Sequence, residues 1–97
     1  NKRLRLYFGG TVISDSAAAA WNGQVWRFNA DVISTGAATQ ISIADWIVGT
    51  ASTSNVHYIE NDAPAADTTA AIVIKVTGLC ASANSDATQL GMIVSYR

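Results

Sequence analysis

The chain has little of what reactive sites are usually built from. Among its 97 residues there is one cysteine, Cys80, and one histidine, His57. A lone cysteine excludes an intrachain disulfide, and one cysteine with one histidine does not make a zinc ligand set. Cys80 stands in an apolar run, so we expect a small buried side chain and not a reactive thiol. His57 lies in a predicted strand, and we expect it to be a structural or interface residue.

Motifs that organise catalysis are missing as well. No nucleophile-elbow motif supports a triad with His57, and the seven acidic residues are scattered along the chain. Gly9-Gly10 lacks the following helix of a phosphate-binding loop, so it indicates a turn or bulge. The acidic stretch from Glu60 to Asp67 has oxygen atoms that suit calcium, but a solvated loop is the better interpretation. We therefore expect no catalytic residue, no metal, no cofactor and no enzymatic activity.

Charge is also scarce, because charged residues make up 13% of the chain and the formal net charge is −1. Binding to nucleic acid normally needs a clustered basic face, and here the one basic cluster is Lys2, Arg3 and Arg5. No apolar run is long enough to span a membrane, and no signal peptide is visible. We expect no nucleic-acid partner and no membrane insertion. The start at Asn1 suggests a processed product or a module of a longer chain.

What the sequence does have is alternation of apolar and polar residues with a period of two, which is typical of strands. Stretches that contain glycine, asparagine, aspartate and proline separate the alternating runs and favour turns. Asn22-Gly23 is a hairpin signal, and Ala17–Ala20 allows at most one helical turn. We predict an all-β fold in a single domain over 1–97, an antiparallel, jelly-roll-like β-sandwich of seven or eight short strands. The predicted strands are 3–8, 11–14, 24–35, 40–48, 56–60, 70–77 and 88–96.

Several predicted strands carry apolar residues on both faces. Leu4, Leu6 and Phe8 are expected in the core, as are Trp26 and Phe28, because each set alternates with polar residues. The opposite faces nevertheless carry valine and isoleucine, and large exposed apolar patches usually mark contacts. We predict an oligomer, although a bulge that exchanges the two faces would give the same pattern. Trp46 stays open between core and interface. The predicted subunit interface comprises Arg3, Arg5, Val25, Arg27, Ile33, Val73 and Ile93.

The tryptophan outside the alternating runs raises a second possibility. Trp21 lies in a polar stretch beside Asn22, and an exposed loop tryptophan can stack on a sugar ring or anchor a protein. The alternative is that Trp21 folds back and caps the end of the sandwich. Trp21, Asn22 and Tyr58 are therefore the predicted ligand or receptor residues. On this hypothesis the protein is a carbohydrate-binding module.

Three stretches in a fixed order carry a resemblance to a known family. They are Lys2–Thr11, Ser34–Gln40, and Lys75–Gly78 followed by Asn84–Asp86. In this order they resemble small β-sandwich modules of tailed-bacteriophage virion proteins, especially at the C-terminal ends of tail fibres. The chain departs from the pattern at Ser34, at Leu79-Cys80 and in the longer loop Ala17–Gln24.

The resemblance implies a role without catalysis. It implies a virion structural protein, in a fibre or as a capsid decoration, that forms trimers and sits on the surface of the particle. The expected partners are two further copies, other virion proteins and, for host attachment, a glycan of the host surface. Lys2, Arg3 and Arg5 would then lie on the outer or inter-subunit side of the first strand, where arginine suits ion pairs between chains.

Overall fold

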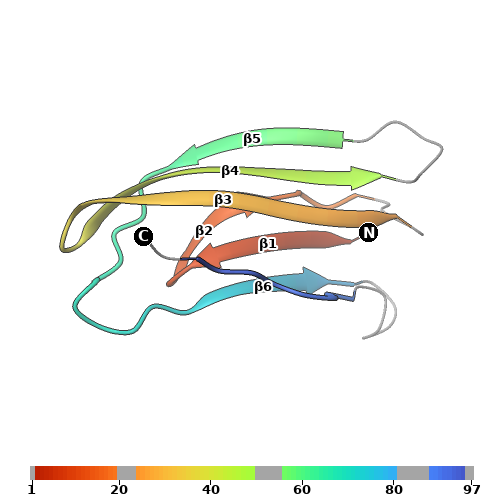
Figure 1. Ribbon diagram of the computed structural model, residues 1–97. Coiled ribbons are helices and arrows are strands. Elements are labelled where there is room, and N and C mark those ends of the chain that lie inside the picture. The colour runs from red at the N-terminus through yellow and green to blue at the C-terminus, as the bar shows by residue number, and fades with distance from the viewer. Residues whose placement is uncertain (1, 20–23, 50–55, 81–87, 96–97) are drawn as a thin grey trace.

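The computed structural model describes residues 2–19, 24–49, 56–80 and 88–95. Two antiparallel three-stranded sheets lie as two layers, in the orders β2-β1-β6 and β3-β4-β5 (Figure 1). No helix of a length and apolarity that could cross a membrane occurs in these four ranges. The strands are β1 (Arg3–Phe8), β2 (Thr11–Asp15), β3 (Val25–Gly36), β4 (Thr39–Gly49), β5 (Val56–Asp62) and β6 (Ile74–Leu79).

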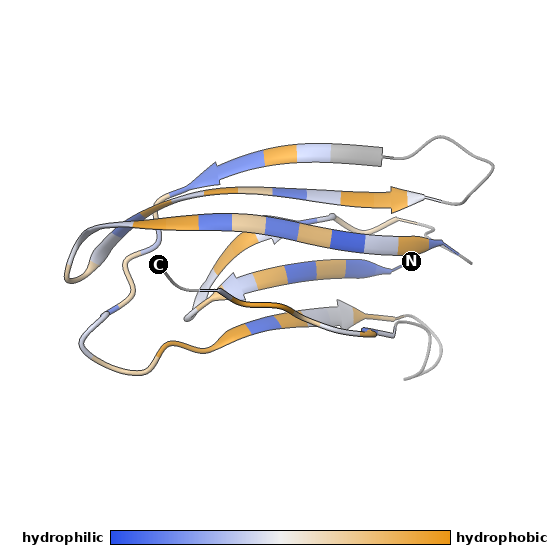
Figure 2. Cartoon of the chain, viewed as in Figure 1, coloured by the Kyte–Doolittle hydropathy of each residue, from blue (hydrophilic) through white to orange (hydrophobic). Residues whose placement is uncertain are grey.

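The all-β sandwich predicted from the alternation is confirmed. Hydrophobic and hydrophilic bands alternate along β3 in Figure 2, as expected for a strand with two different faces. The second sheet is a meander, whereas the first pairs β1 with both its hairpin partner β2 and the distant β6. A jelly roll uses about eight strands, so the six strands of the described residues form a smaller sandwich.

The turn between β1 and β2 shows why the chain reverses at Gly9-Gly10. Phe8 pairs with Thr11, so these two glycines alone make the connection. Gly9 has a φ of 60°, a left-handed conformation that glycine adopts without steric cost. Its N–H donates to the carbonyl of Val73 at 2.9 Å. The predicted turn is therefore confirmed, and it is tied to the stretch that leads into β6.

The core lies between the inner faces of the two sheets. The first sheet contributes Leu4, Leu6 and Ile13, each at most 8% exposed. Trp46, open between core and interface in the sequence, is buried on the inner face of β4 at 4% exposure. Its ring stacks on that of Tyr58, with 4.9 Å between the ring centroids. From β4 the other buried apolar side chains are Ala44 and Val48, and Trp26 and Phe28 of β3 are half-buried.

A buried glutamine holds the long connection between β5 and β6 against β4. The Gln40 side chain donates from Nε2 to the carbonyl of Ala66 at 2.9 Å, and its Oε1 accepts from the Ala66 N–H at 3.0 Å. The Gln40 backbone N–H donates to the carbonyl of Pro64 at 3.1 Å. Because Gln40 is 3% exposed, these bonds replace the water that its amide would otherwise need.

Three predictions about local structure were wrong. Residues 88–95 form no strand, although their alternation is strand-like, and 70–73 are also outside β6. Ala17 has a φ of 56°, and neither it nor Ala18 or Ala19 is helical. An isolated bridge instead pairs Ala19 with Lys2, the residue that precedes β1. The hairpin signal Asn22-Gly23 lies outside the described residues.

Candidate interaction surfaces

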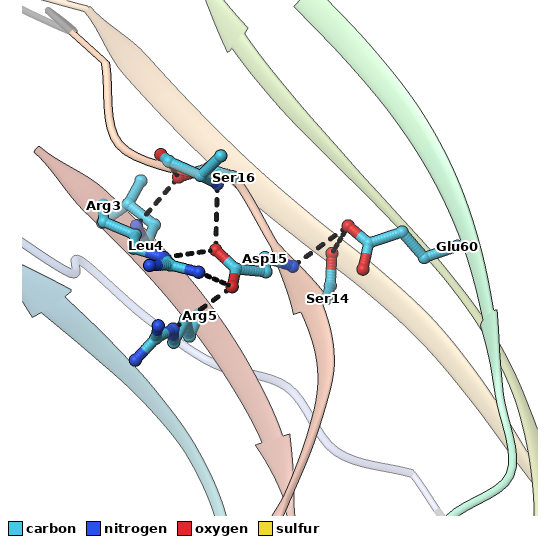
Figure 3. Close-up of polar contacts among 8 residues, drawn as sticks. Arg3, Leu4, Arg5, Ser14, Asp15, Ser16 and Glu60 are labelled. Carbon is cyan, nitrogen blue, oxygen red and sulfur yellow. Dashed lines mark hydrogen bonds and ion pairs between the residues drawn. The ribbon is translucent and has the colours of Figure 1, made fainter.

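The outer face of the first sheet carries the basic cluster. Arg3 donates from Nε and Nη2 to the two carboxylate oxygens of Asp15, at 2.9 and 2.6 Å. Arg5 donates from Nε to the same carboxylate at 3.2 Å, so two guanidinium groups share one acid (Figure 3). The Gly9-Gly10 turn folds β2 back along β1, and a β-bulge between Leu6 and Tyr7 then shifts the register by one residue so that Arg5 pairs with Asp15. The arginines thus lie outside the core, as predicted, but they pair within the chain.

These contacts set the electrostatics of the cluster. Hydrogen bonds from Arg3 lower the pKa of Asp15 to about 2, with further help from the Ala17 N–H and from Arg5. The same carboxylate raises the pKa of Arg3, chiefly through its hydrogen bond. A bidentate guanidinium–carboxylate pair is the strongest form of such a contact. Asp15 therefore stays ionised in all but strongly acidic solution.

A shallow hollow lies beside the basic cluster on the same outer face, across β1 and β6. On its β1 side Tyr7 is covered by the cation of Lys75, whose Nζ lies 4.8 Å from the ring centroid. The cation–π contact draws the lysine over β1 and away from the free edge of β6. The lining residues are Arg3, Arg5, Tyr7, Thr77, Gly78 and Leu79.

A carboxylate from the second sheet joins the two layers near this cluster. Glu60 of β5 accepts hydrogen bonds from the hydroxyl of Ser14 at 3.3 Å and from the backbone N–H of Asp15 at 3.0 Å. Figure 3 shows Glu60 reaching from β5 to β2, while Asp15 turns to the arginines on the other side of β2. Ser14 is fully buried, so Glu60 supplies the partner that its hydroxyl needs.

The outer face of the second sheet carries a stripe of isoleucines among polar side chains such as Asn29, Asp31 and Asp45, and sequence reasoning underestimated this stripe. Ile33 of β3 pairs directly with Ile41 of β4, and Ile43 follows on the same face. Ile59 of β5 lies on this face opposite Asp45. We call Ile33, Ile41, Ile43 and Ile59 the isoleucine face; they are 56, 52, 49 and 65% exposed. The sequence signal was present, because Ile41 and Ile43 alternate with the buried Ser42 and Ala44.

The predicted interface residues lie on several surfaces. Val25, Arg27 and Ile33 share the outer face of β3, with Val25 at one end and Ile33 in the isoleucine face. Val73 precedes β6, and Ile93 lies in the segment 88–95; both are exposed. The structure therefore places Ile33 in the isoleucine face. Arg3 and Arg5 lie on the other sheet.

The predicted ligand residues are only partly described. Trp21 and Asn22 lie outside the described residues. Tyr58 is 58% exposed, yet one side of its ring is stacked on Trp46, so at most the other side is open to a ligand.

The acidic stretch and the cysteine show no metal geometry. No group of three or more histidine, cysteine, aspartate or glutamate side chains gathers anywhere in the described ranges. Asp67 accepts from the N–H and the hydroxyl of Thr69, at 2.9 and 2.6 Å, and these bonds lower its pKa. Glu60 turns inward to Ser14. Cys80 is a free, half-buried thiol just past the end of β6.

Comparison of the chain with family models, with curated proteins and with solved structures finds no match. The resemblance to phage virion modules therefore rests on the three sequence stretches alone. The function of the chain has to be inferred from these stretches and from the outer faces of its two sheets.

Proposed function

We propose that the protein is a virion structural module that assembles with copies of itself through its sheet surfaces and performs no catalysis. One observation supports the assembly above all others, which is that the second sheet exposes four isoleucines on its outer face in addition to the apolar side chains that it packs in the core. Trp46 and Val48 on its inner face are buried in the core, whereas the four residues of the isoleucine face are exposed on its outer side. An antiparallel sheet that meets water on one side normally carries polar residues there.

The energy available on this face suits an interface. Complete burial of an isoleucine side chain contributes roughly 1.5–3 kcal/mol, so one that is about half exposed still has about 1 kcal/mol to gain. Four such side chains on one surface offer about 4 kcal/mol before the cost of association. Arg27 and Asp31 flank the apolar residues on β3, and a polar rim of this kind is usual around an interface core.

The placement in a virion rests on the resemblance of Lys2–Thr11, Ser34–Gln40 and Lys75–Gly78 to tailed-phage modules. On this proposal the module is a trimer on the particle surface, in a fibre or as a capsid decoration, and it adopts a jelly-roll-like arrangement when assembled. Three copies together would present any weak contact to a host glycan with the avidity of a multivalent binder.

The test is a pair of matched lysine substitutions, with the mass of the assembly measured by light scattering. Ile43→Lys puts a cation into the isoleucine face opposite Asp31, where the folded monomer tolerates it. Ala38→Lys adds the same charge in the exposed turn between β3 and β4. We expect the wild type and Ala38→Lys to form assemblies of three 10.2 kDa chains, and Ile43→Lys to be monomeric with an unchanged circular dichroism spectrum. A wild type that stays monomeric throughout the micromolar range, or an Ile43→Lys variant that assembles normally, would refute the proposal.

A further inference from the structure

Residues 88–95 have the alternating sequence of a strand, but they pair with no strand of the described residues. Leu90 and Ile93 are 96 and 97% exposed, and Met92 and Val94 are also exposed. Within the described part of the chain, the hydrogen bond found in this segment is a local one, from Gln89 Nε2 to the carbonyl of Gly91. The segment has neither charge nor proline, so nothing in its sequence opposes strand pairing. We call 88–95 the unpaired segment; Figure 1 draws it as a dark blue ribbon without a strand arrow.

The sandwich has an open edge that matches such a segment. Within the described ranges β6 pairs with β1 on one side only, so every second residue of β6 directs its N–H and C=O away from the sheet. Natural proteins usually protect such an edge with charged side chains. β3 carries Arg27 and Asp31, and β5 carries Glu60 and Asp62, whereas the one charge of β6 is Lys75. That lysine lies over Tyr7 of β1, so the free edge of β6 is the least protected of these three.

The core is less tightly packed beside β6 than beside β2. β2 is the strand of the first sheet that makes the main contacts with the second sheet, to β4 and β5. On the inner side of β6, Ile74 and Val76 are only half-buried, as are Trp26 and Phe28 of β3. A fourth strand beside β6 would bring its own apolar side chains to this underfilled side.

We propose that the unpaired segment of one copy adds as a fourth strand to the free β6 edge of a second copy. The inference deepens the proposed function and rests on it, since it adds strand exchange as a second contact between the copies, beside the isoleucine face. Among the described residues of one chain, both the segment and the edge are unpaired, which is why the proposed occupant is a second copy. Such a contact is heterologous, so three copies can close into a ring in which every segment and every edge is paired.

Hydrogen exchange on the full chain tests this directly. Backbone amides that enter a sheet exchange more slowly, by about a hundredfold or more in a stable ladder. We expect the amides of 88–95 to be protected in the assembled protein and to exchange freely when dilution releases monomers. The double variant Met92→Pro/Ile93→Pro removes two consecutive N–H groups, one of which must face β6, and should lose both the protection and the assembly. Thr88→Pro is the matched control, because proline is tolerated at the first residue of a strand.

The other outcomes separate the two proposals. An assembled wild type whose segment exchanges freely would overturn strand exchange and leave the isoleucine face as the interface. Protection that is equal in monomer and assembly would also overturn it, because the segment would then pair with the edge of its own chain. A wild type that never assembles would contradict the proposed function itself.

Discussion

The ion pairs of Asp15 predict a measurable loss of stability in acid. The pKa of this carboxyl falls from 3.8 to about 2 in the folded protein, chiefly through the hydrogen bonds from Arg3. A difference of one pKa unit corresponds to about 1.4 kcal/mol, so the upper bound is about 2.5 kcal/mol. Asp15 is 24% exposed, and solvent screening at such a site reduces the expected contribution to about 1–2 kcal/mol.

Because the pKa of Asp15 is lower in the folded protein, the ionised carboxylate stabilises the fold. The folded state holds the proton less tightly than the unfolded chain, so the stabilisation is fully present above the unfolded pKa of 3.8. It is lost as the pH falls from 3.8 through about 2, where the folded carboxyl is itself protonated. Asp15→Asn should therefore lower the free energy of unfolding by about 1–2 kcal/mol at neutral pH. The difference from the wild type should shrink towards zero near pH 2.

The assay is urea unfolding followed by tryptophan fluorescence, at one fixed protein concentration because assembly adds to the apparent stability. Ala38→Asn, which adds an asparagine in the exposed turn between β3 and β4, is the control and should change the free energy of unfolding little at either pH. If Asp15→Asn and the wild type unfold at the same urea concentration at neutral pH, the ion pairs contribute no stability. A difference that persists unchanged in acid would mean that the asparagine acts through packing and not through charge.

Two further substitutions test how the turns and the long connection are held. Gln40→Ala removes the side-chain amide that both donates to and accepts from Ala66. It should lower the free energy of unfolding in urea by about 2–4 kcal/mol. Gln89→Ala, at an exposed position, should leave this free energy almost unchanged. Gly9→Ala should cost about 1–2 kcal/mol because of the φ of 60°, while Gly10→Ala, where an added Cβ meets open space, should be nearly neutral. If Gln40→Ala and Gln89→Ala lowered the free energy of unfolding equally, the two bonds to Ala66 would contribute no stability. If Gly9→Ala and Gly10→Ala did so, the φ of Gly9 would not require glycine.

Period-two alternation predicted the long strands because it reports local geometry. In β4, Ile41 and Ile43 alternate with Ser42, Ala44 and Trp46, and the structure places these two sets on opposite faces. The alternation in 88–96 is just as clear, yet a strand also needs a neighbouring edge, and a sequence pattern contains no information about that edge. The predicted strand is absent because the segment has no neighbouring edge among the described residues, and the proposed exchange between copies would supply that edge.

The polar contacts were less accessible to sequence reasoning. The pairing of Arg5 with Asp15 could not have been derived from the Gly9-Gly10 turn alone, because a regular two-residue turn would place Arg5 opposite Ser14. The observed register depends on a β-bulge between Leu6 and Tyr7, which shifts the pairing by one residue. The bond from Ser14 to Glu60 was equally inaccessible, since it joins two sheets across 46 positions of the sequence. Contacts between layers depend on how the sheets pack, and no local pattern encodes that arrangement.

The most direct test of the central claim is hydroxyl-radical footprinting of the wild type across a dilution series. The claim is that the isoleucine face is covered by another copy in the working form of the protein. We predict that Ile41, Ile43 and Ile59 are oxidised in dilute monomers and become protected in the assembled protein. Equal oxidation of the three isoleucines in monomer and assembly would show that copies meet elsewhere, and the account of this surface would be wrong.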